Sequence, residues 1–525
     1  MITDARSMAR GSRIQADLCV IGGGPAGISI AREFIARGLQ VCLLEAGGLE
    51  YDDETQALYK GENIGHPYYD LNVLRLRFLG GGTNHWGGWC LPLDPIDFEV
   101  RPGIPDSGWP IDIGHLRPFY ERAARVCGAG AYEYDPGRWE DETQPRLALA
   151  EDKFLSAVMK RAPTFFGQVY REELDRSSNV HLYLYANVVE LETDPNARRV
   201  TSVRVATLQG ARFHVDAKVF VLATGGIENP RLLLASNKFQ SAGLGNGNDL
   251  VGRYFMEHLM VPGAMFLPSD PTFPLAYYEE PLSKTAMGTG FLHVAPELMR
   301  EKKLLNARIL IMPGVAQELA MKDSAGVSSA TLLWGAVKTG KSPGDLSSHI
   351  ANIIGDLDKI AIYSYRRAFR SPADPVSLKY ELEQAPNPES RVTLGPELDA
   401  LGTPRVRLNW KFGDLERRTL RQVNEALAIE VGRAGLGRIQ IVDDDETGWP
   451  PGLRGSWHQM GTTKMNVDPA RGVVDPDCRV HGIANLFIAG SSVFPTSGTS
   501  NPTMTIVALA LRLSDHIRDL FRQGL

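Results

Sequence analysis

The feature that most constrains the fold lies near the N-terminus, where an apolar run leads into closely spaced glycines and then into a helix-like stretch. Residues 17–21 (DLCVI) are typical of a buried strand, residues 22–27 (GGGPAG) of a tight turn, and residues 28–38 of a helix that ends at a glycine. A second apolar run, residues 41–44, ends at Glu45. This order predicts a Rossmann-type dinucleotide-binding unit.

Each part of this unit has a physical role in holding a dinucleotide. We expect Gly22 to permit the tight turn, Gly24 to let the backbone approach a pyrophosphate, and Gly27 to let the helix pack closely on the strand. The first turn of the helix presents free N–H groups and the positive end of the helix dipole to the phosphates. Glu45 can accept hydrogen bonds from a ribose diol, and its charge would repel a 2′-phosphate.

The chain is too long for one ordinary hydrophobic core. Its 525 residues predict two domains. Hydrophobic residues make up 43% and charged residues 22%, a balance typical of soluble globular proteins. The net charge of −6 gives no indication of a basic surface, so we predict no nucleic-acid partner.

The cysteines and the N-terminal residues favour a cytoplasmic protein. The five cysteines form no CxxC pair and no cluster with metal-ligand spacing, so we predict neither a disulfide framework nor a bound metal. The first 15 residues hold no apolar segment typical of a signal peptide, and no run of about 18 apolar residues predicts a membrane span. A periplasmic location would therefore need co-export with a partner.

Two later segments predict strands that return to the first sheet. Residues 218–226 (KVFVLATGG) and residues 485–492 (NLFIAGSS) are apolar runs that end in small residues, and a helix-like stretch follows each. Between them, residues 261–450 contain prolines and alternating runs such as residues 307–311 (ARILI), which favours an antiparallel sheet with helices. Residues 343–370, polar and then helical, are interpreted as a lid or a partner surface.

These segments predict an α/β protein with two discontinuous domains. Residues 1–105, 180–260 and 455–525 are expected to form the Rossmann-type nucleotide-binding domain. Residues 106–179 and 261–454 are expected to form an inserted α+β substrate domain built on an antiparallel sheet.

A glycine-rich loop at residues 79–89 (LGGGTNHWGGW) holds two indoles and one imidazole. Its glycines would let the backbone come close to a flat ligand. The same composition also fits a structural turn with a packed pair of tryptophans, so the residues alone leave both interpretations open.

Several motifs follow one another in a fixed order along nearly the whole chain. They are VIGGGPAGISIA with LLEAG, LGGGTNHWGG, SGWPI, VLATGGIENPRLLL, VGRYFMEH, EQAPNPESRVTL, WHQMGTTKM and LFIAGSSVFPTSGTSNPTMTIVALA. In these motifs the sequence resembles the glucose–methanol–choline (GMC) family of FAD oxidoreductases, and within it the bacterial glycoside 3-oxidases and the pyranose oxidases. The resemblance implies FAD as the cofactor and a p-hydroxybenzoate hydroxylase-like arrangement of the two domains.

The resemblance also implies a catalytic pair, His458 and Asn501, on the last two motifs. A neutral imidazole, with an unperturbed pKa of about 6.5, suits the removal of a hydroxyl proton while hydride leaves the carbinol carbon. We therefore assign His458 as the general base and Asn501 as the residue that orients the substrate oxygen. The alternative for His458 is a core histidine that packs beside Trp457.

We expect the cofactor to lie against the glycine turns, the strand ends and the last motif. The predicted cofactor-binding residues are Gly22, Gly24, Pro25, Ala26, Gly27, Glu45, Gly81, Gly82, Thr83, Asn84, His85, Trp86, Val188, Ala223, Thr224, Gly225, Gly490, Ser491, Asn501, Pro502 and Thr503.

The sequence departs from the family pattern at two of these positions. Pyranose oxidases attach FAD covalently through the histidine of a Thr-His-Trp motif, whereas Asn84 here intrudes between Thr83 and His85. This favours non-covalent FAD, with a covalent link through His85 as the alternative. Ser491 stands where the family more often has Asp, and we interpret it as a weaker hydrogen-bonding substitute near the ribityl chain.

Four further residues lie in motifs whose role the resemblance leaves less specific. Gln384 and Arg391 belong to a segment that resembles the substrate-domain wall facing the flavin, and contacts with sugar hydroxyls and packing roles are both open. His258 and Arg253 match a segment that we interpret as structural, near the domain junction.

The leading hypothesis for function is FAD-dependent oxidation of a sugar or glycoside ring hydroxyl, at C2 or C3, to a ketone by hydride transfer to flavin N5. The acceptor is dioxygen, a quinone or a cytochrome-type partner, since the sequence has no CxxCH haem motif and no iron–sulfur cysteine set. The alternatives are a GMC-type dehydrogenase of a non-sugar alcohol or sugar acid, and a flavoprotein subunit that acts through a docked redox partner. An oligomer or a small partner subunit fits either alternative.

Overall fold

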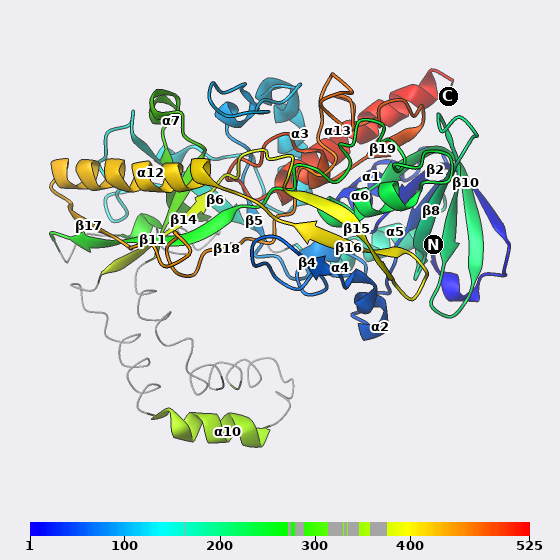
Figure 1. Ribbon diagram of the computed structural model, residues 1–525, viewed down its shortest axis with the longest axis horizontal. Helices are drawn as coiled ribbons and strands as arrows, with labels where there is room; N and C mark the ends of the chain where they lie inside the picture. Colours follow the sequence, from blue (N-terminus) through cyan, green and yellow to red (C-terminus); the bar gives the residue numbers. More distant parts are fainter. Residues whose placement is uncertain are drawn as a thin grey trace.

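The computed structural model describes residues 1–162, 164–270, 275–278, 288–312, 329, 333, 346–357 and 375–524. Two large sheets lie side by side along the long axis of the molecule, one at the end that holds both termini and the other around β11 and β14 (Figure 1). The prediction of an α/β protein with an antiparallel second sheet is confirmed.

The first sheet is built around the predicted N-terminal unit. Its strand order is β1-β7-β3-β2-β10-β9-β8, and β19 pairs with β10. The strands from β1 to β10 and the β19 pair are parallel, whereas β9 pairs antiparallel with both β10 and β8. The strands are β1 Ile2–Asp4, β2 Arg13–Ile21, β3 Val41–Leu44, β7 Val180–Leu184, β8 Asn187–Thr193, β9 Val200–Ala206, β10 Arg212–Leu222 and β19 Leu486–Ile488.

The second sheet is antiparallel throughout its printed order, β17-β11-β14-β13-β12-β6-β5, with β18 on β11. A small third sheet joins β15 and β16 to β4. The strands are β4 Glu62–Asn63, β5 Trp89–Cys90, β6 Phe154–Arg161, β11 Leu259–Pro268, β12 Gly288–Val294, β13 Ala307–Met312, β14 Val376–Leu382, β15 Arg391–Leu398, β16 Pro404–Asn409, β17 Gly437–Ile441 and β18 Arg454–Gly455.

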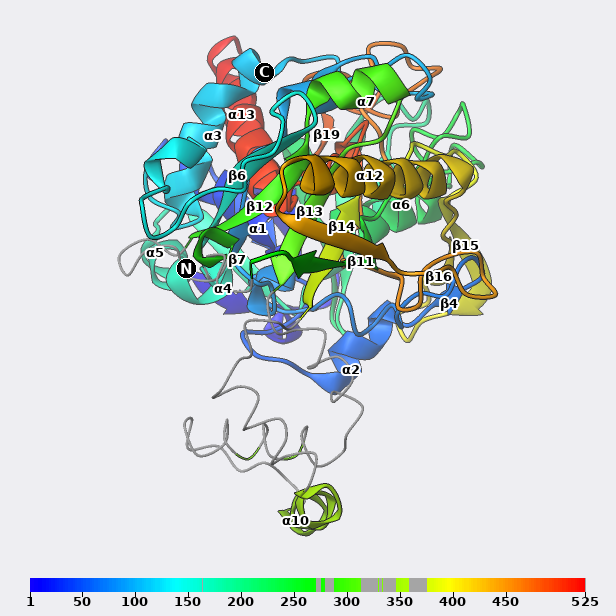
Figure 2. The same ribbon diagram turned by 90° about the vertical axis from the view of Figure 1, so that its left-hand side faces the viewer.

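Helices cover both sheets. A view turned by 90° shows α12 lying across the second sheet, with α13 and α3 grouped beside the first (Figure 2). The helices are α1 Pro25–Glu33, α2 Asp53–Gln56, α3 Ile113–Val126, α4 Phe166–Val169, α5 Arg171–Arg176, α6 Gly225–Ala235, α7 Pro296–Lys302, α10 Leu346–Gly355, α12 Asp414–Arg433 and α13 Thr503–Arg522. Within the described part of the chain, none of the helices is long and apolar enough to cross a membrane.

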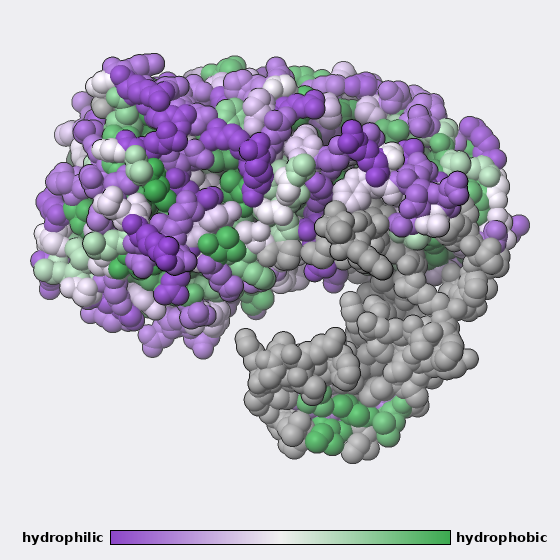
Figure 3. Space-filling view, turned by 180° about the vertical axis from the view of Figure 1, so that it is seen from behind, coloured by the Kyte–Doolittle hydropathy of each residue, from purple (hydrophilic) through white to green (hydrophobic). Residues whose placement is uncertain are grey.

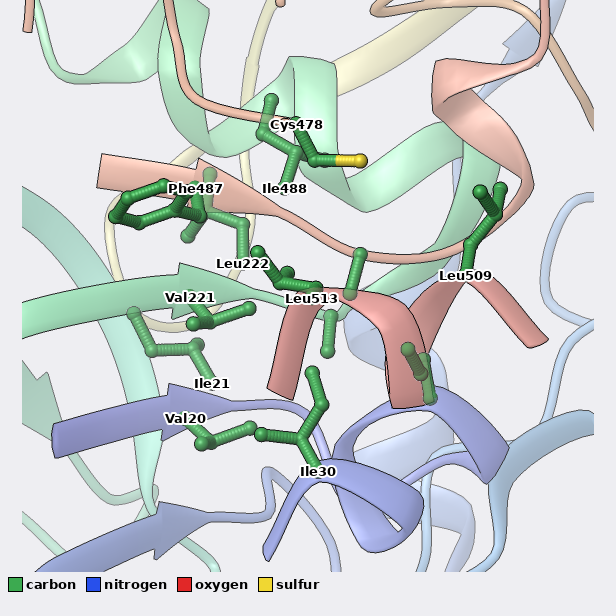
Figure 4. Packing of buried hydrophobic residues seen from close by; sticks show 14 of the residues in the cluster. Val20, Ile21, Ile30, Val221, Leu222, Cys478, Phe487, Ile488, Leu509 and Leu513 are labelled. Atoms are coloured by element: carbon green, nitrogen blue, oxygen red, sulfur yellow. The ribbon is translucent and has the colours of Figure 1, made fainter. Parts of the chain in front are cut away.

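The core of the first domain lies between the parallel strands and helices α1 and α13. Figure 4 shows Val20, Val221 and Ile488 on three neighbouring strands, with Ile30 of α1 and Leu513 of α13 pointing toward them. All five side chains are buried. Because burial of one aliphatic side chain stabilises a fold by about 1.5–3 kcal/mol, this packing holds the strand ends, and the turns that follow them, in fixed positions.

The chain divides between the two sheets differently from our expectation. Residues 106–179 were expected in the second domain, and β6 does lie in the second sheet. Helix α3, however, packs on α13, and Arg122 forms ion pairs with Glu33 and Asp515 of the first domain. In the other direction, β5 lies in the second sheet, although its residues were expected in the first domain. An apolar helix face fits either sheet, so the sequence pattern alone did not decide between them.

Helix α10 lies apart from the body of the molecule in both ribbon views (Figures 1 and 2). Apolar side chains gather on its surface in the view from behind (Figure 3). Ile350 on the helix is 46% exposed, and Leu357 just after it is 57% exposed. The rest of the expected lid or partner surface at residues 343–370 lies outside the described residues.

Candidate active site

A cavity of about 340 Å³ opens at the carboxyl ends of β2, β3, β10 and β19. The residues that follow these strands, Gly22, Glu45, Ala223 and Gly490, all line it. The loop at residues 456–459 also lines the cavity. In open α/β sheets ligands bind at this edge, so the topology of the parallel sheet indicates that this cavity is a ligand-binding site.

The glycine turn has the geometry that its sequence predicts. Gly22 has a φ of +110°, and a Cβ there would lie 2.5 Å from the carbonyl oxygen of Ala223. A Cβ on Gly27 would lie 1.9 Å from the carbonyl oxygen of Gly22, so this glycine allows α1 to pack against the turn. A Cβ on Gly24 would meet no described atom within 4 Å, because this position opens into the cavity.

Glu45 lies at the end of β3 with its carboxylate buried beside the turn. Its two oxygens accept N–H groups from Gly23, at 2.9 Å, and from Gly47, at 2.8 Å. Burial raises the pKa of Glu45, while these N–H groups act in the opposite direction. Each carboxylate oxygen keeps a second lone pair, and the residue lines the cavity, so a ribose hydroxyl can still be bound there.

The glycine-rich loop lines the cavity directly beside the dinucleotide turn, where the backbone N–H of Gly80 donates to the carbonyl oxygen of Gly23, at 2.7 Å. Gly81, Gly82, Thr83, His85 and Trp86 line it, and the indole Nε1 of Trp86 is buried without a hydrogen-bond partner among the described residues. A buried indole N–H without a protein partner is a candidate donor for a bound ligand. Our two interpretations of the loop therefore meet: the loop packs its tryptophan and also forms a ligand wall.

Asn84 is a correction to the predicted set. Its side-chain amide donates to the carbonyl oxygen of Leu79, at 3.0 Å, and the residue does not line the cavity. Gly27 also lies behind the cavity wall rather than on it. The other predicted cofactor-binding residues all reach the cavity: Gly22, Gly24, Pro25, Ala26, Glu45, Gly81, Gly82, Thr83, His85, Trp86, Val188, Ala223, Thr224, Gly225, Gly490, Ser491, Asn501, Pro502 and Thr503.

Two arginines in the cavity wall were missed by the sequence reasoning. Arg75 donates to Glu228 at 2.8 Å, and Arg77 lies 3.6 Å from the same carboxylate; both guanidinium groups lie over the ring of Tyr59. Burial would raise the pKa of Glu228, but Arg231 and these two arginines lower it to about 2. The motif LRLRF, directly before the glycine loop, was the available signal, because alternate basic residues beside a phosphate-binding turn favour an anion.

The ends of β10 and β19 are tied together by Asn229. Its side-chain oxygen accepts from the backbone N–H of Thr224, at 2.9 Å, and its amide donates to the hydroxyl of Ser492, at 2.9 Å. The hydroxyl of Ser491 donates to the carbonyl oxygen of Gln459, at 2.6 Å. Ser491 therefore also anchors the loop that closes the cavity.

His458 and Asn501 meet at the far end of the cavity, although 43 positions separate them. The side-chain nitrogen Nδ2 of Asn501 lies 3.4 Å from Nε2 of His458, and both residues are half-buried and line the cavity. Burial, followed by the neighbouring His258, lowers the pKa of His458 well below its ordinary value, so its imidazole is neutral at pH 7.

Arg308 sets the orientation of the Asn501 amide. Its Nη2 donates to Oδ1 of Asn501 at 2.9 Å, and because a guanidinium only donates, the amide oxygen must face it. The amide nitrogen then faces His458 and the cavity. Arg308 is itself held by Glu381, which accepts from its Nε at 2.6 Å, and both side chains are buried.

The Arg308–Glu381 pair places a charged group directly behind Asn501, at the end of the cavity where it meets His458. Burial would raise the pKa of Glu381, but Arg308 and Lys379 lower it to about 2, so the carboxylate stays ionised. Arg308 lies on β13 and Glu381 directly opposite on β14. The alternating run at residues 307–311 gave no indication of a role for Arg308, because a single arginine in an alternating strand is most often a surface residue.

His258 contacts the other side of His458. The two Nδ1 atoms lie 3.0 Å apart, and Nε2 of His258 lies 3.2 Å from the carbonyl oxygen of Ser497. Burial lowers the pKa of His258 to about 4. We had interpreted His258 as structural; the structure places it in direct contact with the residue assigned as the base.

The loop that carries His458 is held in a strained conformation. Trp457 has a φ of +65°, a backbone region that non-glycine residues rarely adopt; the residue is 38% exposed and lines the cavity. Its ring packs against His85, at 5.1 Å between centroids, and against Tyr69, at 5.5 Å. The buried carboxylate of Glu257 accepts the backbone N–H of Ser456, at 3.0 Å, and so fixes the start of this loop.

Gln384 and Arg391 do not reach the cavity. The buried amide of Gln384 accepts from Trp410 Nε1, at 2.8 Å, and from the backbone N–H of Glu257, at 3.0 Å, and its nitrogen donates to two backbone carbonyls. Arg391 pairs with Asp249 at 3.0 Å, as Arg253 also does. Neither residue lines the cavity, which favours the packing role that we had left open over contact with the substrate.

The cavity fits FAD, the cofactor that the resemblance implied. A Cβ built on any of four cavity-lining glycines would meet no described atom within 4 Å, so the backbone there leaves room for a ligand. These glycines are Gly24, Gly82, Gly225 and Gly490. Positive charge from Arg75 and Arg77 and the N-terminus of α1 suit a pyrophosphate, and the unpartnered Trp86 N–H offers a donor. Glu45 suits a ribose, and His458 with Asn501 would face the redox-active ring.

Family models match two parts of the chain. The model described as "FAD dependent oxidoreductase" matches residues 17–238, and the model described as "GMC oxidoreductase" matches residues 386–510. A C-glycoside 3-oxidase of Microbacterium trichothecenolyticum is 35% identical over 84% of this chain and 75% of its own length. A 2-methyl-1,2-propanediol dehydrogenase of Mycolicibacterium austroafricanum is 25% identical over 97% of this chain and 96% of its own length.

A solved structure has the same fold. Pyridoxine 4-oxidase from "Mesorbium loti" superposes with a TM-score of 0.56, at 17% sequence identity, over 96% of this chain and 99% of its own. The match covers both sheets of the molecule, so the two-domain arrangement belongs to the shared fold rather than to this chain alone.

Proposed function

The chain belongs to the GMC oxidoreductase family of FAD-dependent enzymes that act on CH–OH donors, and on that premise we propose that it oxidises a sugar or glycoside ring hydroxyl, at C2 or C3, to a ketone. The single observation that carries the proposal is the pair formed by His458 and Asn501. These residues present a proton acceptor and a hydrogen-bond donor side by side, 3.4 Å apart, at the end of the cavity.

This pair is complementary to an alcohol. A hydroxyl that donates its proton to Nε2 of His458 can accept a hydrogen bond from Nδ2 of Asn501 on the same oxygen. Bound FAD would supply the hydride acceptor, at flavin N5. His458 would take the hydroxyl proton while the carbinol carbon gave up its hydride, with two electrons, to that acceptor, and the substrate oxygen would become that of a ketone.

Asn501 favours this reaction through the arginine behind it. The charge-assisted bond from Arg308 to the amide oxygen polarises the amide and strengthens the opposite N–H as a donor. Negative charge grows on the substrate oxygen as its proton moves to His458. The strengthened donor therefore stabilises the transition state more than the bound alcohol.

Two observations support a sugar or glycoside as the substrate. The relative with the highest identity reported above bears the name C-glycoside 3-oxidase. In addition, Trp457 and Trp89 line the cavity, and Trp457 is partly exposed there, so that an indole face is available to the apolar C–H face of a pyranose ring.

We also propose that FAD is bound without a covalent link. Asn84 separates Thr83 from His85, and the ring of His85 packs against Trp457 inside the cavity wall. Precipitation of the holoenzyme with acid should release the yellow chromophore into the supernatant. Colour that stays with the pellet in the wild type, and leaves it in His85→Ala, would establish the covalent alternative.

The substrate proposal is tested by anaerobic reduction of the flavin. The holoenzyme is mixed with a panel of free sugars, O- and C-glycosides, sugar acids and non-sugar diols, and the loss of flavin absorbance is followed. We expect rapid bleaching by a pyranoside, with a keto group at C2 or C3 of the product by NMR. Bleaching by diols or sugar acids alone would keep the enzyme class and overturn the sugar assignment.

A second candidate is a flavoprotein that passes electrons to a docked redox protein. The observation that favours it is the pair of exposed apolar side chains on and after α10, Ile350 and Leu357. Re-oxidation of the reduced enzyme by air, by a quinone and by a cytochrome separates the acceptors. If Ile350→Ser with Leu357→Ser slows re-oxidation by the cytochrome alone, docking through α10 is supported; an equal rate removes this candidate.

A further inference from the structure

His258 has no part in the oxidation step proposed above, although it contacts the proposed base. It is fully buried, and its Nδ1 lies 3.0 Å from Nδ1 of His458. We propose that His258 is a positioning residue that fixes the tautomer of His458, so that Nε2 of His458 is left unprotonated and faces the substrate. The proposal rests on the proposed role of His458 as the base.

The direction of the hydrogen-bond chain follows from the group at its inner end. The carbonyl oxygen of Ser497 can only accept, so Nε2 of His258, 3.2 Å away, carries the proton. A neutral His258, whose pKa burial lowers to about 4, then has an unprotonated Nδ1. That atom accepts from Nδ1 of His458, and a neutral His458 protonated at Nδ1 has its lone pair on Nε2.

The outer end of the chain agrees with this assignment. Arg308 can only donate, so the oxygen of Asn501 faces it and the amide nitrogen faces Nε2 of His458. A protonated Nε2 would place two donors against each other at 3.4 Å. Two groups with unambiguous roles, Ser497 at one end and Arg308 at the other, thus demand the same tautomer.

The partner of His458 is a neutral imidazole rather than a carboxylate. The nearby carboxylate of Glu257 is occupied by the hydroxyl of Tyr68 and by the backbone N–H groups of Ser456 and His258. The charged groups whose fields reach both histidines are Glu381 and Arg308, which oppose each other. His258 therefore orients His458 and contributes a lone pair, while it adds no negative charge of its own.

The tautomer can be measured directly on the wild-type holoenzyme. With histidine labelled with ¹⁵N in the ring, the signals of His458 are identified as those missing from the His458→Gln variant. We expect a pyridine-type shift for Nε2 and a pyrrole-type shift for Nδ1. The opposite pattern, or an average of the two, would overturn the proposal without any substitution at His258.

Kinetics then test the positioning role. In His258→Leu, which has no acceptor, we expect the anaerobic flavin-reduction rate constant to fall on the order of 10- to 100-fold, with substrate affinity and flavin content little changed. His258→Gln keeps one acceptor and one donor and should recover most of the rate. The matched control is His481→Leu, which removes a half-buried histidine whose Nε2 lies 2.9 Å from the backbone oxygen of Asn466, away from the cavity.

Failure of this inference and failure of the proposed function have different signatures. If no alcohol reduces the wild-type flavin, the proposed function falls, whatever the tautomer. If an alcohol reduces it but His258→Leu is as fast as the wild type, the positioning role falls and the function stands. Equal losses in the Leu and Gln variants, together with lost flavin, would assign His258 to packing alone and likewise overturn the proposal.

Discussion

The two ends of the cavity are built in different ways. The end that suits the dinucleotide is made mainly of backbone. It consists of the glycine turn after β2, the loop glycines Gly81 and Gly82, and the strand ends that carry Glu45 and Ala223. The catalytic end is made of side chains, and its bonded chain includes His258, His458 and Asn501 from distant segments. A backbone site is specified by local sequence, whereas a side-chain network exists only after the whole chain has folded.

The two ends also use buried charge differently. At the dinucleotide end, Glu228 balances several arginines in a wall that a phosphate can approach. At the catalytic end, Arg308 pairs with Glu381 and also donates a hydrogen bond to the side-chain oxygen of Asn501. We therefore expect substitutions at the first end to act mainly on cofactor affinity, and those at the second on stability and on the rate of flavin reduction.

The largest expected effect comes from breaking the buried pair at the catalytic end. Arg308→Met leaves the Glu381 charge buried and uncompensated, which should lower the free energy of unfolding by about 3–5 kcal/mol. It also frees the Asn501 amide, so flavin reduction should slow. Denaturant unfolding and stopped-flow reduction measure the two effects.

The matched double variant, Arg308→Met with Glu381→Gln, separates charge balance from orientation. We expect it to regain most of the lost stability, because no buried charge is left, while reduction stays slow, because the Asn501 oxygen has lost its donor. Recovery of the wild-type rate in the double variant would show that the arginine does not orient Asn501.

A pH effect of similar size is expected from Glu257, the carboxylate under the catalytic loop. Burial raises its pKa from 4.5 to about 7. Because the folded-state pKa is raised, the folded protein binds this proton more tightly than the unfolded chain. The contribution to stability is therefore fully present below pH 4.5 and is lost, by about 3 kcal/mol, as pH rises toward 7.

Glu257→Gln mimics the protonated carboxyl and should remove this dependence. Between pH 4.5 and 7, the free energy of unfolding of the variant should rise relative to that of the wild type. Above pH 7 the difference between the two should stay constant. A difference that does not change with pH would mean that Glu257 titrates normally in the folded protein. Glu45 is the matching carboxylate at the dinucleotide end, because it is also buried and also accepts two backbone N–H groups.

At the dinucleotide end, Gly24→Val should weaken FAD binding by about 10- to 100-fold, which corresponds to an overpacking cost of about 1–3 kcal/mol. The φ of −83° and ψ of −172° at Gly24 are open to any residue, so the fold should be retained while the side chain fills ligand space. Flavin content after gel filtration and FAD titration of the apoprotein measure the effect.

The control for this variant is Gly432→Ala on α12, where a Cβ also meets no described atom within 4 Å but the cavity is not involved. It should retain the wild-type flavin content. If Gly24→Val binds FAD as tightly as the wild type, the pyrophosphate does not lie against this turn.

The smallest effect is expected at Arg391, which the sequence placed near the substrate. Its pair with Asp249 is partly exposed, so Arg391→Ala should change the free energy of unfolding by less than about 1 kcal/mol. The KM for substrate should stay at the wild-type value, since the residue does not line the cavity. A several-fold rise in KM would restore Arg391 as a substrate contact.

The contrast between the two ends also explains which parts could be predicted from sequence. The turn from Gly22 to Gly27 and the acidic Glu45 are local, and their spacing alone indicates strand, turn, helix and strand. Helix α1 nevertheless begins at Pro25 and ends at Glu33, three residues earlier at its start than expected, because proline is well suited to a first helical position.

Elsewhere the sequence was insufficient for a physical reason. Gln384 and Arg391 look like polar wall residues until their partners, Trp410 and Asp249, are brought next to them by the fold. Arg308 is one basic residue in an apolar strand, and its significance depends on Glu381, 73 positions away. The resemblance supplied His458 and Asn501, but it supplied neither His258 nor Arg308 as the groups that fix their protons.

The most direct test of the account is the rate of anaerobic flavin reduction in His458→Gln, compared with the wild type, using the fastest-reacting pyranoside from the panel. The glutamine keeps a polar group of similar size but cannot act as a base. We expect unchanged flavin content and a rate constant lower by about 10²- to 10⁴-fold. Reduction at the wild-type rate would contradict the assignment of His458 as the proton acceptor and, with it, the catalytic end described here.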